Sequence, residues 1–392
     1  MTQSNWSVPE TEVLRQVGEG LTEEGVVLAT VVAVEGSAYR RPGAKMVIAG
    51  EGSGVGSITA GCLEDEIRSL AERVAESGTP RLERFDLTND EDDVWGLGVG
   101  CNGVIDVLLE PVDGRFEPLV AARDEKRDVV GVTILDADDV DLKRGARAYW
   151  RPTAETDAVD GRVVAFDAPA DWPGWLLEAV SGPAADLLEA DTSETVTVEG
   201  DGAAVEVFVD VVTAPPHLVV FGTGHDVGPM TELAKRLDFR VTIVGFRGAI
   251  ATEERFPAAD EVFATSPAAV REEISFDAGT YAVVMTHNFV DDRLTLAELL
   301  KTPVEYVGLM GPRERFEEMR EAFADEGRTF EAGELERIYT PTGLDLGGGT
   351  PHQIAQSILA EVTAVHHDRT PKHLKEREGP IHDRPSLAAK EN

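Results

Sequence analysis

The pattern of apolar and polar residues divides the chain into two parts of different periodicity. In the first part, apolar runs of strand length alternate with glycine-rich loops, and an early example is Val26–Val34. An amphipathic helix is predicted after Cys62, because four apolar residues fall on one helical stripe: Leu63, Ile67, Leu70 and Val74. From about residue 113 to residue 212, the pattern predicts short strands separated by acidic turns.

The segment Ala214-Pro215-Pro216 is stiff and incompatible with a helix, so it marks the predicted domain boundary. Nearly continuous apolar strands then alternate with helices, which is typical of a parallel sheet covered on both faces. Thr350-Pro351 supplies the N-cap and first-turn proline of a long helix. The predicted fold class is α/β. It comprises a mixed α+β domain over 1–213 with a β-rich extension from about 113, a Rossmann-type domain over 217–366, and a disordered tail over 367–392.

Acidic residues dominate the charge of the chain, which is formally −37 at pH 7. They are spread along the whole sequence. This favours adaptation to a high-salt cytoplasm, where short screening lengths make self-repulsion tolerable, over an acidic surface for a partner. Nucleic-acid binding is disfavoured, because contacts to phosphates need a basic surface. No run of about eighteen apolar residues occurs, so a cytoplasmic protein without a membrane span is expected.

A glycine loop opens the second part of the chain. Gly222 and Gly224 follow an apolar strand and precede a helix, the context in which such glycines allow a pyrophosphate to approach helix N–H groups. The acidic residue expected about twenty positions later to bind a ribose is absent, and Arg247 stands there instead. Asp226 at the helix start competes with a phosphate for the same N–H groups. The loop therefore predicts the Rossmann fold more firmly than it predicts NAD binding.

Two histidines are predicted at the carboxyl edge of the parallel sheet. His225 follows the glycine loop and His287 ends a later strand, where open α/β sheets bind their ligands. Hydrogen-bonded loop histidines are the alternative. The segment Gly343–Gly349 precedes a helix and is a second candidate for an anion cradle, with a plain flexible loop as the alternative.

The chain has two cysteines, Cys62 and Cys101, and no CxxC pair, which excludes a four-thiolate zinc site. Cys62 is predicted in the first turn of a helix, where a thiol is exposed and activated, although the acidic residues that follow oppose this. A buried cysteine acting as a small apolar residue is the alternative. Cys101 lies among glycines, which allow a ligand to approach the thiol closely.

A basic cluster is predicted at Arg40, Arg41 and Lys45, in a chain where basic residues are scarce. Arginine forks bind phosphates bidentately, so an anion site is one interpretation, and surface salt bridges are the other. A basic loop together with two thiols suits a ligand that carries both a phosphate and a soft metal or sulfur centre.

These segments resemble the XdhC/CoxI family of accessory factors for xanthine and carbon monoxide dehydrogenases. Residues 113–212 contribute little to the resemblance. The matching segments are Gly36-Ser37-Ala38-Tyr39-Arg40-Arg41-Pro42-Gly43-Ala44-Lys45-Met46, Gly56-Ser57-Ile58-Thr59-Ala60-Gly61-Cys62-Leu63-Glu64, Gly98-Val99-Gly100-Cys101-Asn102-Gly103, Phe221-Gly222-Thr223-Gly224-His225, Tyr306-Val307-Gly308-Leu309-Met310-Gly311 with Arg313, and Gly343-Leu344-Asp345-Leu346.

The resemblance implies a maturation factor rather than a stand-alone enzyme. Such a factor binds molybdenum cofactor (molybdopterin), assists its sulfuration by a cysteine desulfurase and delivers it to an apo molybdenum hydroxylase, and a homodimer is expected. It implies that Cys62 and Cys101 are the catalytic and metal-binding residues and that Arg40 and Arg41 hold the pterin phosphate. The other expected cofactor-binding residues are Gly61 beside the thiol and, for a nucleotide on the Rossmann domain, Gly222, Gly224, His225, His287 and Arg247.

The residues alone are compatible with two other functions. One is an NAD(P)-dependent oxidoreductase, against which the missing ribose carboxylate and the lack of an evident acid–base set argue. The other is a regulatory module whose nucleotide domain binds nothing. Neither the client enzyme nor the form of the cofactor follows from the sequence.

Overall fold

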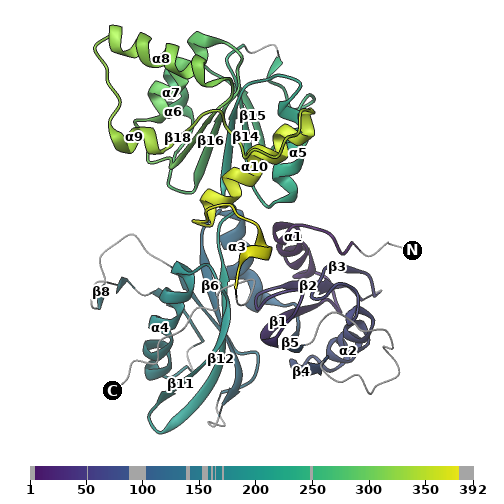
Figure 1. The fold of residues 1–392 in the computed structure, drawn as a ribbon. Coiled ribbons are helices and arrows are strands. Elements are labelled where there is room, and N and C mark those ends of the chain that lie inside the picture. The colour runs from purple at the N-terminus through teal and green to yellow at the C-terminus, as the bar shows by residue number, and fades with distance from the viewer. Residues whose placement is uncertain are drawn as a thin grey trace. The chain divides into compact units, whose positions relative to one another are not determined.

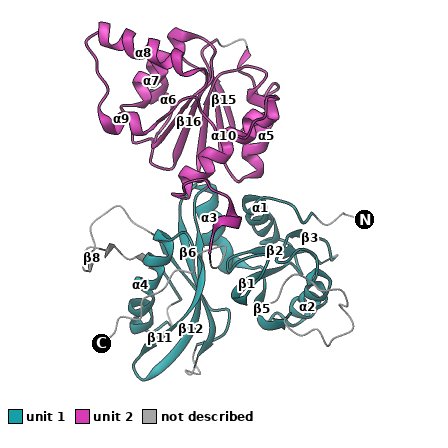
Figure 2. Cartoon of the chain, in the orientation of Figure 1, with its two compact units in different colours: residues 1–214, 384–392 teal, residues 215–383 magenta. Residues whose placement is uncertain are grey.

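The computed structural model describes residues 5–50, 52–87, 103–137, 142–151, 158–159, 162–163, 165–169, 172–247 and 250–378. The chain forms two compact units, of which unit 1 extends to Ala214 and unit 2 begins at Pro215 (Figure 2). No helix among the described residues is long and apolar enough to cross a membrane.

Unit 1 begins with helix α1 (Glu10–Gly20) and a five-stranded antiparallel sheet. Helix α2 (Glu64–Ser77) packs on one face of this sheet through the predicted stripe of apolar residues, all of which are buried. The strands follow the order β3 (Gly54–Gly56), β2 (Lys45–Ile48), β1 (Val27–Gly36), β5 (Gly103–Pro111) and β4 (Arg81–Asp86).

A second antiparallel sheet covers the other face of the first, so β1 and the central strand β6 are buried on both sides. Its strands follow the order β10 (Ala165–Asp167), β7 (Arg147–Arg151), β6 (Val129–Ala137), β12 (Ala203–Val212) and β11 (Glu194–Gly200). A short hairpin, β8 (Ala158–Val159) with β9 (Arg162–Val163), stands apart from both sheets.

Helices α3 (Glu117–Asp124) and α4 (Gly174–Glu189) are not predicted by the sequence pattern, which indicated only strands and turns in this region. In α4 the pair Gly182-Pro183 lies mid-helix, and such a pair normally ends a helix. The helix forms nevertheless because its apolar stripe is fully buried against the second sheet: Leu176, Val180, Ala184 and Leu187. Tertiary burial here outweighs local propensity.

Two buried ion pairs join the sheets of unit 1. Lys45 of the first sheet lies 2.7 Å from Asp210 of the second, and Arg147 of the second lies 2.6 Å from Glu110 of the first. All four side chains are at most 7% exposed. The prediction that Lys45 belongs to a basic cluster with Arg40 is therefore wrong, because packing of the sheets buries its ammonium group against a carboxylate 165 positions away.

Unit 2 contains the predicted parallel sheet. Its strands follow the order β15 (Glu261–Ala264), β14 (Arg240–Gly245), β13 (His217–Phe221), β16 (Thr280–Val284), β17 (Tyr306–Leu309) and β18 (Ile338–Tyr339). Numbered along the chain, this is the order 3-2-1-4-5-6 of a Rossmann fold, with its switch point between β13 and β16.

Helices cover both faces of this sheet, as predicted (Figure 1). One face packs against α5 (Val227–Arg236) and α10 (Pro351–His366). The other face packs against α6 (Val270–Glu273), α7 (Phe289–Leu299) and α8 (Arg313–Asp325). Three short helices complete the description of the unit: the 3₁₀ helix η3 (Pro267–Ala269), α9 (Ala332–Glu336) and the 3₁₀ helix η4 (Leu374–Glu376). Residues 379–392 of the predicted disordered tail lie outside the described residues.

The predicted N-cap of the last long helix is confirmed, since the Thr350 hydroxyl accepts a hydrogen bond from the Gln353 N–H. We expect Thr350→Ala to lower the free energy of unfolding by about 1 kcal/mol, because an N–H of the first turn loses its acceptor. Ser266→Ala is the matched control, since Ser266 precedes η3 without making a capping bond. Urea denaturation that gave equal losses for both variants would contradict this account.

Candidate functional site

The motif loops of unit 1 leave its first sheet from a single edge. Because neighbouring strands are antiparallel, the end of β1, the start of β2 and the end of β3 lie together. The end of β4 and the start of β5 lie at the same edge, since Asp86 pairs with Val104 and Gly36 with Gly103. The Arg40–Arg41 loop and the Cys62 loop therefore belong to one end of one sheet.

The buried carboxylate of Glu64 holds the Cys62 loop through hydrogen bonds. Glu64 is 3% exposed, and it accepts hydrogen bonds from the N–H groups of Thr59 (3.0 Å) and Leu63 (3.1 Å). It also accepts one from the Thr59 hydroxyl at 2.6 Å, and that hydroxyl accepts a weaker bond from the Gly61 N–H. The backbone on both sides of Cys62 is thus tied to one side chain, which holds the loop in a single conformation.

The thiol of Cys62 is half-buried and free, on a loop rather than in the first turn of a helix. Helix α2 begins two residues later, at Glu64, so the predicted placement of Cys62 inside that turn is corrected. The preceding residue, Gly61, has φ +114°, and a Cβ built there would meet no atom of the described residues within 4 Å. None of the described residues fills the space on the Gly61 side of the thiol.

At the predicted anion site, Arg40 and Arg41 both already interact within the chain. Arg40 forms an ion pair with Glu10 of α1, and its side chain is 30% exposed. Arg41 is exposed at the same loop. A phosphate at this loop would therefore compete with the contacts that both arginines already make.

Cys101 lies outside the described residues, so its expected role as a catalytic and metal-binding residue stays a prediction. The described chain stops at Leu87 and resumes at Gly103, and these two residues are hydrogen-bonded to each other. Gly103 packs tightly against the loop that follows β1, because a Cβ built on it would lie 2.5 Å from the Ser37 carbonyl oxygen. Glycine is required at this position by that close approach.

In unit 2 the glycine loop and His287 flank the switch point of the sheet. Gly222 has φ +151°, and a Cβ there would lie 2.5 Å from the Met285 carbonyl oxygen at the end of β16. His287 adopts φ +60°, an unusual backbone for a residue other than glycine, of the kind that gathers at functional sites. Its Nε2 lies 3.1 Å from an oxygen of Asp226, so the two loops are joined directly across the switch point.

The same arrangement works against a pyrophosphate at the glycine loop. Asp226 is the N-cap of α5 but makes no capping bond, and its Oδ1 is buried without a hydrogen-bond partner among the described residues. That oxygen lies over Gly224, since a Cβ built there would be 2.4 Å from it. His225 is exposed beside them. A pyrophosphate here would face the Asp226 carboxyl group at a place where a dinucleotide-binding domain presents only N–H groups.

The remaining predicted residue of this edge, Arg247, is exposed and pairs with Asp291 of α7 at 3.2 Å. The structure therefore gathers Gly222, Gly224, His225, His287 and Arg247 at the carboxyl edge of one sheet. It does not supply a carboxylate from the end of β14 itself, because Gly245-Phe246-Arg247 occupies that position.

Each unit of the chain contains a segment that matches a protein-family model. Residues 218–362 match the model of the XdhC Rossmann domain, and residues 21–86 match the model of the XdhC and CoxI family. The chain belongs to the XdhC and CoxI family. The two matched segments include the Cys62 loop, the Arg40–Arg41 loop and every predicted site residue of unit 2, whereas Cys101 lies outside them.

Two similar proteins cover most of the length of this XdhC and CoxI family member, and a third covers less than half of it. It is 28% identical over 341 residues to a probable xanthine dehydrogenase subunit of Bacillus subtilis (strain 168), which is 87% of this chain and 93% of that protein. It is 28% identical over 165 residues to the uncharacterized protein YqeB of Escherichia coli (strain K12), 42% of this chain and 30% of that protein. The crystal structure of a xanthine dehydrogenase from Bacillus halodurans is similar with a TM-score of 0.70 and 26% identity, over 92% of this chain and 96% of that one.

Three residues near the switch point of this family member are not predicted from the sequence. Asp292 is 1% exposed and accepts a hydrogen bond from the Thr286 N–H at 3.2 Å. Arg315 donates to its other oxygen at 2.6 Å. Together they fix the loop that carries His287. The only sequence signal was the Met310-Gly311 motif, and it indicated Arg313 rather than Arg315.

The second anion cradle, predicted at Gly343–Gly349, uses its N–H groups within the unit instead. Gly343 N–H donates to Glu361 at 2.8 Å, and Leu344 N–H donates to the Ser357 carbonyl oxygen at 3.2 Å, both on α10. Glu361 also accepts a hydrogen bond from the buried Tyr306 hydroxyl at 2.8 Å. These contacts anchor the segment to α10 and leave the two N–H groups without a role in anion binding.

Proposed function

We propose that this protein is an accessory factor for a molybdenum hydroxylase of the xanthine or carbon monoxide dehydrogenase type. In this role it binds molybdenum cofactor at the Cys62 loop, assists its sulfuration and delivers it to the apo-enzyme. Family membership and the two xanthine dehydrogenase relatives support the accessory role. The site itself supports the ligand chemistry.

The conformation of the Cys62 loop carries the proposal. A half-buried thiol stands on a loop whose backbone is hydrogen-bonded to Glu64, and no atom of the described residues occupies the space beside Gly61. A pre-organised soft sulfur donor beside an open space suits a molybdenum centre, which prefers such ligands. The adjacent Arg40–Arg41 loop leaves the sheet at the same edge and supplies cations for the terminal phosphate of the pterin.

Cys62 has a second role in the proposed sulfuration. Its thiolate attacks the outer sulfur of a persulfide on the cysteine desulfurase, so that a new S–S bond forms on Cys62 while the desulfurase cysteine leaves as a thiolate. Molybdenum cofactor, the cargo, would exchange a terminal oxo ligand, which leaves as water after taking up two protons, for sulfide. The two electrons that reduce the persulfide sulfur to sulfide would come from Cys62 and a second thiol as they form a disulfide. We propose Cys101 as the second thiol of this reaction. We also propose that the protein is a cytoplasmic homodimer, which binds first the desulfurase and then the apo-enzyme.

The binding step is tested with Cys62→Ser, which keeps the size of the side chain and removes the soft donor. We expect about a tenfold or greater loss of affinity for molybdenum cofactor released anaerobically from a molybdenum hydroxylase, because one metal–sulfur contact disappears. Cys101→Ser is the second arm. Thermal unfolding checks that the folds match, and unchanged affinity of Cys62→Ser would show that the thiol has no part in binding.

For unit 2 we propose a nucleotide whose phosphate lies beside the Gly222 turn and not on it, near His225, His287 and Arg247. Such a phosphate would compete with the contacts of His287 to Asp226 and of Arg247 to Asp291. Oxidoreduction with NAD(P) is the weaker candidate, because Asp226 opposes a pyrophosphate and β14 ends without a carboxylate. Calorimetric titration with NAD⁺ and NADP⁺ separates the two candidates. Tight binding accompanied by turnover would replace the accessory role with an enzymatic one.

A further inference from the structure

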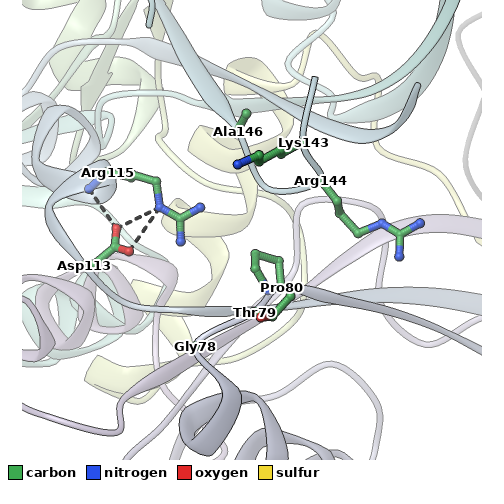
Figure 3. A pocket seen from close by; sticks show the side chains of 8 residues that line it. All are labelled: Gly78, Thr79, Pro80, Asp113, Arg115, Lys143, Arg144 and Ala146. Atoms are coloured by element: carbon green, nitrogen blue, oxygen red, sulfur yellow. Dashed lines mark hydrogen bonds and ion pairs between the residues drawn. The ribbon is translucent and has the colours of Figure 1, made fainter. Parts of the chain in front are cut away.

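A basic groove lies on unit 1, at the opposite end of α2 from the Cys62 loop. Its volume is about 670 Å³, within the range of small-molecule sites. One wall is the turn after α2, with Thr79 and Pro80, and the other wall comes from the turn before β7, with Lys143 and Arg144 (Figure 3). Arg115 and Asp113 complete it from the turn after β5.

Packing and hydrogen bonds hold the turns that form the walls of this groove. Gly145 has φ +79°, and a Cβ there would lie 2.5 Å from Pro80, so the two turns pack directly on each other. Arg115 donates from Nη1 to the Gly145 carbonyl oxygen at 2.8 Å and from Nε to Asp113 at 2.9 Å. Arg144 donates from Nε to the Leu135 carbonyl oxygen at 2.7 Å. Both guanidinium groups are thus held in place before any ligand arrives.

The charge of the groove is opposite to that of the protein. Three of its lining side chains are cationic and one is a carboxylate, in a chain with a net charge of −37. Burial acts to raise the pKa of Asp113, but the hydrogen bonds and charge of Arg115 outweigh it and lower the pKa. The Asp113 carboxylate is therefore paired with Arg115. The Lys143 side chain makes no hydrogen bond or ion pair within the described part of the chain, and it points toward the Arg115 side (Figure 3).

We propose that this groove binds a phosphorylated small molecule, with Arg115 and Lys143 on the phosphate and Arg144 at its margin. Arginine forks and a lysine point charge are the usual ligands of phosphate oxygens. The groove is a separate site from the Cys62 loop. Helix α2 has 14 residues and is about 20 Å long, so one cofactor molecule does not span both of its ends. The site therefore serves a second ligand, whose binding is independent of the thiol.

The test is calorimetric titration of the full chain with inorganic pyrophosphate and with AMP, and with citrate as an anion that lacks phosphorus. The groove variant is Lys143→Gln/Arg144→Gln. Its matched control is Lys126→Gln/Arg127→Gln, which removes the same charge from an exposed turn of the same unit. Arg40→Gln/Arg41→Gln reports any binding at the other basic loop. We expect the groove variant to bind pyrophosphate and AMP at least tenfold more weakly, while both other variants bind as the unchanged protein does.

Citrate should bind at least tenfold more weakly than pyrophosphate, and all affinities should fall as salt rises from about 0.1 M to 1 M. Equal pyrophosphate binding by the groove variant and the unchanged protein would overturn the proposal. So would the absence of any phosphate binding, or equal affinity for citrate, since the groove would then serve another kind of anion, such as an acidic protein segment.

Discussion

Arg147→Met is expected to lower the free energy of unfolding of unit 1 by about 3–5 kcal/mol, because it leaves the Glu110 carboxylate buried without its counter-ion. Glu110 is 1% exposed, and one of its oxygens already lacks a hydrogen-bond partner among the described residues. Arg147 also donates to Thr133 at 2.8 Å and stacks on Phe116. The loss therefore combines an orphaned charge with lost packing.

The matched comparison is the double variant Glu110→Leu/Arg147→Met, which removes both charges and should recover most of the stability. Arg127→Met breaks an exposed pair with Glu125 and should cost less than about 1 kcal/mol. Denaturant unfolding measures all three. A double variant as unstable as Arg147→Met would show that packing, rather than the buried charge, determines the loss.

The penalty of Arg147→Met should also depend on pH. Burial raises the pKa of Glu110, and the charge of Arg147 opposes this, so removal of Arg147 raises the pKa further. A carboxyl whose pKa is higher in the folded state stabilises the fold at low pH and loses that contribution as pH rises. The penalty should therefore be smaller at pH 5 than at pH 8. A penalty that did not change between these values would mean that the loss of Arg147 does not raise the pKa of Glu110 in the folded state.

Glu64→Ala is expected to cost about 3 kcal/mol of stability and to abolish the fixed conformation of the Cys62 loop. It leaves the N–H groups of Thr59 and Leu63 and the Thr59 hydroxyl without their acceptor in a buried place, at about 1–3 kcal/mol for each unsatisfied group before relaxation. If the loop binds molybdenum cofactor as proposed, affinity should fall although the thiol is still present, because the loop is no longer pre-organised.

The structural part of this prediction has a readout that does not depend on the ligand. In a Cys101→Ala background, alkylation of Cys62 should be faster in Glu64→Ala, and hydrogen exchange at the Thr59 and Leu63 amides should accelerate. Glu66→Ala lies on the exposed side of the same turn and should change stability by less than about 0.5 kcal/mol. Unchanged exchange at both amides would mean that Glu64 does not hold the loop.

Much of the local structure could be predicted because its signals are short-range. The apolar stripe of α2 and the strand–helix alternation after residue 216 depend only on the periodicity of neighbouring residues, and both are confirmed. The Thr350 cap is a contact between residues three apart, so it is equally readable. Helix α4 could not be predicted in this way, because its own sequence contains the helix-breaking pair Gly182-Pro183. The burial that stabilises it comes from a sheet whose strands are distant in the sequence.

The candidate site could be predicted only as separate segments. Glu64 appeared in the sequence as one acid among several, and its place under the Cys62 loop depends on how the chain turns before α2. Asp226 and His287 are 61 positions apart in the chain, and they meet only because β13 and β16 are neighbours in the sheet. No pattern of adjacent residues carries that pairing.

Hydrophobic periodicity and glycine loops act over a few residues, so they were enough to predict the Rossmann-type topology of unit 2 and the residue types that bear chemistry. Which charges meet was set by the tertiary structure alone. It buried Lys45 against Asp210 and turned Asp226 toward His287, and it placed three cations around one groove of an acidic protein. Such pairings depend on the packing of elements remote in sequence, and burial then determines whether a charge is solvated or must find a partner.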